Sequence, residues 1–142
     1  MKDMNIKIID LELARLIRRV TSASRKIGHL DRSAYLILNR ILSEGPAGVK
    51  VLAEEAHLDI STLSRQTASL EQKGYVERIP DPVDRRAYTL QITELGKKEF
   101  YEHQKLRFAA LDENLEAWAD DEIEVFAKLL TKYNHPFTKK ES

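Results

Sequence analysis

Residues 59–96 change from a helical to an extended pattern and back, and this change limits the fold of the chain more than any other feature. In residues 59–74 the apolar side chains recur every three or four positions, and Gly74 stands where a left-handed residue ends a helix. Residues 75–79 and 88–92 are rich in aromatic and β-branched side chains and flank a polar loop with two prolines. This order predicts a mainly α chain with one small β-hairpin.

Helical apolar spacing continues on both sides of this segment. The predicted helices cover residues 6–27, 32–44, 49–58, about 94–119, and a last helix that starts at Asp120 or Asp121. The residues predicted to cap helices are Asp31, Asp59 or Ser61, and Thr93. The predicted inward face of the helix within 59–74 consists of Ile60, Leu63, Thr67 and Leu70. The outer helices are long and amphipathic, so each needs a partner surface, which a second copy of the chain could provide.

The composition excludes several classes of function. A chain of 142 residues predicts one domain, and its 23 basic and 23 acidic residues cancel, so a nucleic-acid interface must depend on local charge. The absence of cysteine excludes disulfides, thiolate metal sites and thiol redox sensing. No apolar run approaches the roughly 20 residues of a membrane helix, and the N-terminus lacks a signal-peptide core. We therefore expect a soluble cytoplasmic protein.

No pattern in the sequence predicts catalysis, a metal site or a cofactor. The chain has neither a Gly-rich phosphate loop nor a nucleophile with a matching base. The histidines are His29, His57, His103 and His135, and no pair has the spacing of helical metal ligands. An enzyme is therefore the weaker hypothesis, and no catalytic residue, metal or cofactor is predicted.

The helix within residues 59–74 carries a small polar face that fits a DNA groove. If its apolar residues point inward, the 100° step of a helix places Ser61, Arg65 and Ser69 on the far side. The flanking positions of this face are Thr62, Ser64 and Gln66. Arginine can bridge guanine O6 and N7, and hydroxyl groups can reach bases or phosphates. The short helix before it completes a helix-turn-helix arrangement, whereas the alternative interpretation is a solvated helix face.

The loop between the predicted strands holds Asp84, Arg85 and Arg86. An arginine at the tip of a hairpin can enter a narrow minor groove, where the negative potential is enhanced. Asp84 is expected to orient Arg86, because a carboxylate fixes the guanidinium group through charge-assisted hydrogen bonds. The alternative is a surface ion pair that contributes less than about 1 kcal/mol.

Together these features resemble the multiple antibiotic resistance regulator (MarR) family. The resemblance is carried by residues 52–100, "LAEEAHLDISTLSRQTASLEQKGYVERIPDPVDRRAYTLQITELGKKEF", with "STLSR" opening the recognition helix and "DPVDRR" in the wing. It implies a winged helix-turn-helix core at about residues 31–93. It also implies dimerisation helices at about 5–28 and 94–135, within a single domain covering 1–142.

The resemblance also implies how such a protein works. Members form homodimers that bind a pseudo-palindromic operator in double-stranded DNA, and they commonly act as repressors that a small phenolic or lipophilic ligand releases. By motif position, the implied DNA contacts are Ser61, Thr62, Ser64, Arg65 and Arg86, with Asp84 in support. An alternative is a winged helix that contacts only proteins, in which case Arg65 and Arg86 would be dispensable for nucleic-acid binding.

The start of the second helix departs from the family pattern. Members often have "LT-x-x-Q" there, whereas this chain has Asp31 and Ala34 at the Thr and Gln positions. Because that region often lines the ligand cleft, the departure bears on effector chemistry. Tyr35 and Phe108 are candidate effector-pocket residues, with the protein core or the dimer interface as the alternative.

Charge is distributed unevenly along the chain. Residues 13–30 contain five bases and no acid, and these bases are Arg15, Arg18, Arg19, Arg25 and Lys26. Residues 109–127 contain no base, and their acids are Asp112, Glu113, Glu116, Asp120, Asp121, Glu122 and Glu124. Opposite charges on helices that meet could set their pairing and register, although two solvated faces are an equal alternative.

Overall fold

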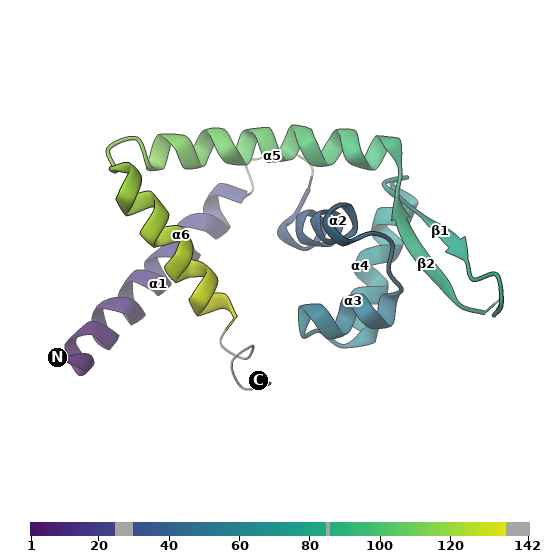
Figure 1. Ribbon diagram of the computed structural model, residues 1–142, viewed down its shortest axis with the longest axis horizontal. Helices are drawn as coiled ribbons and strands as arrows, with labels where there is room; N and C mark the ends of the chain where they lie inside the picture. Colours follow the sequence, from purple (N-terminus) through teal and green to yellow (C-terminus); the bar gives the residue numbers. More distant parts are fainter. Residues whose placement is uncertain (25–29, 85, 136–142) are drawn as a thin grey trace. The chain divides into compact units, whose positions relative to one another are not determined.

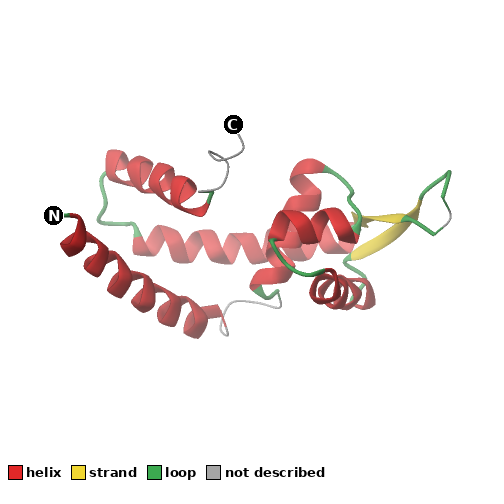
Figure 2. Ribbon diagram, turned by 90° about the horizontal axis from the view of Figure 1, so that it is seen from below, coloured by secondary structure: helices red, strands yellow, loops and turns green. Residues whose placement is uncertain are grey.

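The structure is a computed structural model that describes residues 1–24, 30–84 and 86–135. Its elements in chain order are α1 (Lys2–Ser24), α2 (Arg32–Glu44), α3 (Val49–Ala56), α4 (Ile60–Gln72), β1 (Val76–Pro80), β2 (Tyr88–Ile92), α5 (Glu94–Asn114) and α6 (Asp120–Asn134) (Figures 1 and 2). The predicted mainly α fold with a β-hairpin wing is confirmed. The chain separates into two compact units, Met1–Leu106 and Arg107–Ser142, which are described separately.

The core of the first unit lies among α2, α3, α4 and the hairpin. Leu38, Leu63 and Leu90 come from three of these elements and are fully buried. The other large buried apolar side chains are Leu30, Ile37, Ile41, Leu52, Leu70, Val76, Ile92 and Phe100. This core fixes which side of α4 faces inward and which side remains outside.

The hairpin is attached to the core at two places. The two strands pair antiparallel from Val76 opposite Ile92 to Pro80 opposite Tyr88. The amide of Leu90 donates to the carbonyl of Ala47 (2.8 Å), which joins β2 to the segment before α3. On β1, the guanidinium of Arg78 lies 4.2 Å from the centre of the Tyr88 ring and donates to the carboxylate of Glu71 on α4 (2.9 Å).

A compact junction links α4, the hairpin and α5. Gly74 has φ +80°, its amide donates to Glu71, and the amide of Tyr75 donates to Leu70 (2.9 Å). These two bonds form a Schellman motif. The hydroxyl of Thr93 donates to the carbonyl of Gly74 (2.6 Å) and accepts the amide of Gly96 (3.0 Å), so it caps α5 and ties it to the end of α4. The predicted roles of Gly74 and Thr93 are confirmed.

Three predictions about the helices are wrong. Ile60 was expected to face inward, but its side chain is 52% exposed, because it is the first residue of α4 and lies one turn before the buried row. The first helix begins at Lys2 instead of Ile6, and its predicted end at residue 27 lies outside the described residues.

The predicted end of the long helix near residue 119 is the third error. α5 ends at Asn114, so Trp118 lies in the connection to α6, where its ring packs 5.2 Å from that of Phe126. The amide of Trp118 turns back to the carbonyl of Leu115 (3.0 Å), and the carboxylate of Glu122 accepts the amide of Ala119 (2.9 Å). The bond between Glu122 and the amide of Ala119 therefore starts a new helix, although the apolar spacing of α5 continues past residue 114.

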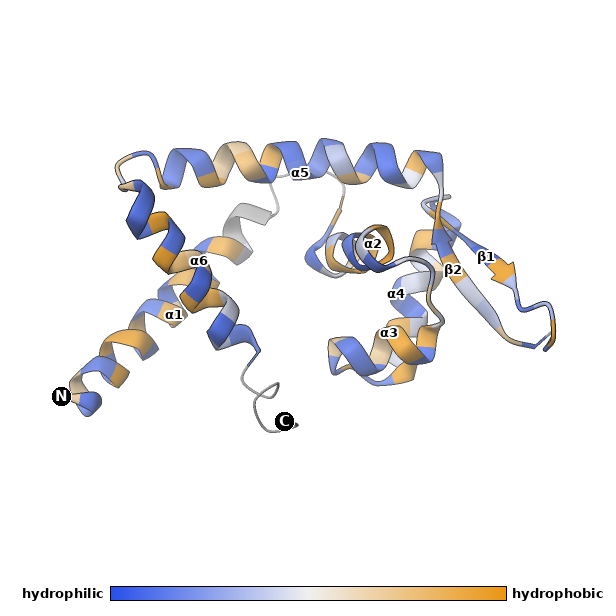
Figure 3. Cartoon of the chain, in the orientation of Figure 1, coloured by the Kyte–Doolittle hydropathy of each residue, from blue (hydrophilic) through white to orange (hydrophobic). Residues whose placement is uncertain are grey.

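α1 and the second unit carry apolar side chains that this chain leaves exposed. None of the described side chains of α1 or α6 is buried. Figure 3 shows hydrophobic residues recurring along both helices. The exposed large apolar residues of α1 include Met4, Ile6, Ile8, Ile9, Leu11, Leu16 and Ile17. Those of α6 are Val125, Phe126, Leu129, Leu130 and Tyr133. Across the described residues, no helix has the length and apolar character needed to span a membrane.

Candidate nucleic-acid interface

α3 and α4 form a helix-turn-helix with a tight connection. His57 adopts a left-handed conformation (φ 56°, ψ 40°), and its amide donates to the carbonyl of Glu54 (3.3 Å), which ends α3. The carboxylate of Asp59 accepts the amide of Thr62 (3.1 Å) and caps α4. Asp59, and not the alternative Ser61, is therefore the cap, and its bond to Thr62 fixes the first turn of α4.

The outward side of α4 is small, polar and positively charged. Leu63, Thr67 and Leu70 are buried. The exposed predicted contacts are Ser61, Ser64, Arg65 and Ser69, whereas Thr62 and Gln66 are half-buried. The helical period therefore correctly predicted which side of α4 faces outward. Arg65 is the positively charged residue at the centre of that side.

Asp59 and Arg65 share the first turns of α4. Hydrogen bonds from Thr62 hold the pKa of the Asp59 carboxyl below its usual value, and the nearby charge of Arg65 contributes in the same direction. Nη2 of Arg65 lies 3.5 Å from the hydroxyl of Thr62, which is at the limit of a hydrogen bond. Asp59 therefore stays ionised as a cap, while the guanidinium of Arg65 lies in solvent and is accessible to a ligand.

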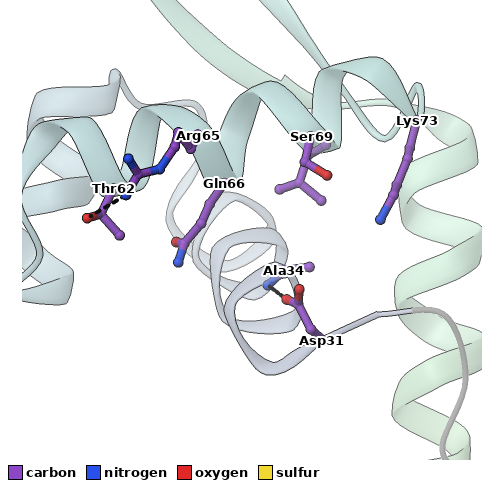
Figure 4. A pocket seen from close by; sticks show the side chains of 8 residues that line it. Asp31, Ala34, Thr62, Arg65, Gln66, Ser69 and Lys73 are labelled. Atoms are coloured by element: carbon purple, nitrogen blue, oxygen red, sulfur yellow. Dashed lines mark hydrogen bonds between the residues drawn. The ribbon is translucent and has the colours of Figure 1, made fainter. Parts of the chain in front are cut away.

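A polar hollow of about 340 Å³ lies between α4 and the start of α2 (Figure 4). It is lined by Asp31, Ala34, Thr62, Arg65, Gln66, Ser69, Leu70 and Lys73. The carboxylate of Asp31 accepts the amide of Ala34 (2.8 Å), which confirms Asp31 as the cap of α2. Gln66 bridges the two helices, because its Nε2 donates to the hydroxyl of Ser33 (3.1 Å).

The wing loop is shaped by its two aspartates. The carboxylate of Asp81 accepts the amides of Val83 (2.8 Å) and Asp84 (3.1 Å), and these bonds hold its pKa below the usual value. The carboxylate of Asp84 accepts the backbone amide of Arg86 (3.0 Å). The contact that the structure gives Asp84 is therefore with the main chain of Arg86 and not with its guanidinium group. Arg86 is exposed, and Arg85 lies outside the described residues.

Comparison with known proteins agrees with this geometry. The model of the MarR family matches residues 30–88. The HTH-type transcriptional regulator YxaD of Bacillus subtilis is 41% identical over 135 residues, which cover 93% of this chain and 94% of that protein. The chain belongs to the MarR family. It is a helix-turn-helix transcriptional regulator, and its relatives are regulators of this kind and not enzymes.

Solved MarR-family structures share the fold over nearly the whole chain. A MarR family protein from Bacillus stearothermophilus has a TM-score of 0.80 at 23% identity, covering 97% of this chain and 99% of that chain. The crystal structure of MarR has a TM-score of 0.77 at 27% identity, covering 92% of this chain and 91% of that chain. The similarity therefore includes the outer helices as well as the helix-turn-helix.

The two candidate effector residues of this MarR-family chain lie in different units. Tyr35 is half-buried and stacks on Phe100 of α5, with ring centres 5.0 Å apart and planes 14° apart. Its hydroxyl accepts a hydrogen bond from Nε2 of Gln104 (3.3 Å), and the ring of His103 lies 5.3 Å away. Phe108 belongs to the second unit and is 54% exposed. An effector pocket that uses both residues stays a prediction.

Two residues beside the outward side of α4 were not predicted from the sequence. Lys73 lies four residues after Ser69 and lines the same hollow, so its helical spacing was a usable signal. Ser33 is remote in sequence from Gln66, and no local pattern links them. Among the described residues, no cluster of three or more histidine or acidic side chains could hold a metal ion.

Proposed function

We propose that this MarR-family regulator is a homodimeric repressor that binds a pseudo-palindromic operator in double-stranded DNA. The observation that carries the proposal is the exposed row of Ser61, Arg65 and Ser69 on the second helix of a helix-turn-helix. The core holds the opposite side of α4, so this row is presented to a partner. A B-DNA major groove admits one α-helix and displays hydrogen-bonding groups that match these side chains.

On this proposal α4 reads the operator from the major groove. Arg65 donates to guanine, and the hydroxyl groups of Ser61, Thr62, Ser64 and Ser69 bind bases or phosphates. The Asp59 cap supports this role, because it fixes the first turn of α4, where recognition helices contact base edges.

The wing carries the second set of proposed DNA contacts. We propose that Arg86 enters the minor groove, with Arg85 contributing to the same contact. Asp84 supports Arg86 by binding its backbone amide, which fixes the direction in which the side chain leaves the loop. Arg78 supports the arrangement from the other end of β1, since it ties the strand to α4 through Glu71.

Homodimerisation is supported by the apolar surfaces that one chain leaves uncovered. α1 and α6 each expose a series of large apolar side chains, such as Ile9 and Leu129. α1 also carries Arg15, Arg18 and Arg19, whereas α6 begins with three acids. A partner that supplies the same helices would cover the apolar surfaces and pair opposite charges. Two recognition helices would then lie about one DNA turn apart.

We propose that a small phenolic or lipophilic ligand releases the repressor from DNA. Such a ligand must bind one conformer of the dimer more tightly than another, because only differential affinity shifts an equilibrium. Tyr35 and Phe108 are the side chains that we expect to contact it. The test is DNA affinity measured with and without a panel of phenols and long-chain alcohols, and equal affinity throughout would contradict this part.

The main test is a salt titration of DNA binding with the DNA upstream of the protein's own gene and an unrelated duplex. We expect tight, steeply salt-dependent binding to the upstream DNA only. Arg65→Ala should weaken it by about 1–3 kcal/mol. Arg86→Ala should weaken it and reduce the salt slope by about 1 if a phosphate contact is lost. Lys98→Ala, at an exposed position of α5, is the control. If the protein binds both duplexes equally weakly, and neither arginine substitution changes the affinity, a winged helix that contacts only proteins would be favoured.

A further inference from the structure

Gln66 lies on the recognition helix, but its side chain is bonded to a different helix. Its amide nitrogen donates to the hydroxyl of Ser33 in the first turn of α2 (3.1 Å), and the side chain is half-buried. Figure 4 shows Gln66 extending from α4 toward the start of α2, where Asp31 and Ala34 lie. This direction differs from that of the exposed Arg65 next to it.

The partner of Gln66 is firmly held. Asp31 caps α2 through the amide of Ala34 (2.8 Å), and its carbonyl accepts the amide of Tyr35 (3.0 Å). The side chain of Ala34, next to Ser33, is buried in the core. The first turn of α2 is therefore well fixed. The hydrogen bond from Gln66 to Ser33 holds α4 at a defined position relative to this turn.

The hollow explains why one hydrogen bond can matter on this side of α4. Leu63 and Leu70 pack into the core and hold one side of the helix. On the flank toward the start of α2, Ala34 and Leu70 still pack in the core. Beside them lies a hollow of about 340 Å³, lined also by Thr62, Arg65 and Ser69, so close packing constrains the rotation of α4 less there than on the side of Leu63. The bond from Gln66 to Ser33 crosses between the helices at this place.

We propose that Gln66 is a positioning residue that sets the rotation of the recognition helix and does not read a base. This inference rests on the proposed function. A glutamine that reads adenine uses both its carbonyl and its NH₂ group on the base edge, whereas the NH₂ group here is engaged by Ser33 inside the protein. The bond keeps Thr62, Arg65 and Ser69 directed outward together.

The test combines a double-mutant cycle with a scan of operator base pairs. Gln66→Ala, Ser33→Ala and the double variant should each weaken operator binding by roughly two- to tenfold, the equivalent of one hydrogen bond. The double variant should be no weaker than either single variant, because both remove the same bond. Ser33→Thr keeps a hydroxyl and should restore affinity. The order of preference among substituted operators should stay that of the wild type.

Controls separate this inference from the proposed function and from simple loss of stability. Ser43→Ala removes a hydroxyl that bonds to Asn39 at the other end of α2, and it should leave DNA affinity unchanged. A wild-type protein without sequence preference would overturn the proposed function itself. If wild-type binding is specific, the inference fails on any of three results: Gln66→Ala erases the preference at one base pair, the two single effects add, or the variants melt earlier but bind DNA as tightly as wild type.

Discussion

Gly96 permits the close junction between α5 and the hairpin. Replacing it with alanine should lower the free energy of unfolding. A Cβ atom at Gly96 would overlap the carbonyl oxygen of Tyr75 and lie 2.8 Å from Cγ1 of Ile92. The carbonyl of Tyr75 also accepts the amide of Thr93 (3.0 Å), so pushing it aside breaks a hydrogen bond. Helix propensity alone predicts the opposite effect, a gain of about 1 kcal/mol for Gly96→Ala.

The steric cost of the added Cβ atom should exceed the gain in helix propensity. Overpacking costs about 1–3 kcal/mol, and the upper end applies because the opposing atom is backbone and cannot rotate away. The lost hydrogen bond adds about 1 kcal/mol. After the propensity gain, the free energy of unfolding should fall by about 3 kcal/mol, which corresponds to a melting temperature lower by roughly 6–12 °C.

Urea and thermal denaturation followed by circular dichroism measure this change. Lys98→Ala, at an exposed position of α5, should change stability by less than about 0.5 kcal/mol. Gly45→Ala provides a comparison, because Gly45 has φ +92° and no atom near its Cβ position, so only backbone strain applies. A Gly96→Ala variant as stable as the wild type, or more stable, would refute the reasoning about the junction.

Three further changes test other parts of the structure. Thr93→Ala should lower the free energy of unfolding by about 1–2 kcal/mol through loss of the α5 cap, and Thr93→Ser should restore it; equal urea midpoints would contradict this. Arg40 lowers the pKa of the Glu55 carboxyl by hydrogen bonding, so Glu55→Gln should destabilise at pH 7 by less than about 1 kcal/mol. That difference should vanish as pH falls through the lowered folded pKa, and a difference that persists in acid would exclude the ion pair as its cause. Leu129→Asp should yield monomers in sedimentation and abolish operator binding. A variant that stays dimeric and binds the operator would contradict the assignment of α6 to the dimer interface.

The sequence predicted those features that depend on local hydrogen bonds. Asp59, Thr93 and Gly74 each act within a few residues of their own position, as a cap or a left-handed turn. The outward direction of Arg65 followed from the helical period alone. These signals do not require knowledge of the rest of the fold, which is why the order of elements and the exposed side of α4 could be derived.

Features set by distant parts of the chain were not predictable in the same way. Ile60 continues the apolar period, and only the observed end of the core shows that it is exposed. Ser33 and Gln66 meet through the packing of α2 against α4, which no local pattern encodes. Asp84 was expected to bind the guanidinium group of Arg86, but in a tight loop its carboxylate reaches the backbone amide two residues later.

The attachment of the hairpin at both strands has a consequence for how an operator would be selected. Arg78 joins β1 to α4 through Glu71, and Leu90 joins β2 to the segment before α3. These two attachments restrict how far the mutual angle of the recognition helix and the wing can adjust to a given duplex. On the proposed function, part of the adjustment then comes from the DNA, which can bend or change its groove width. Base pairs that no side chain touches would then influence affinity through the stiffness of the duplex.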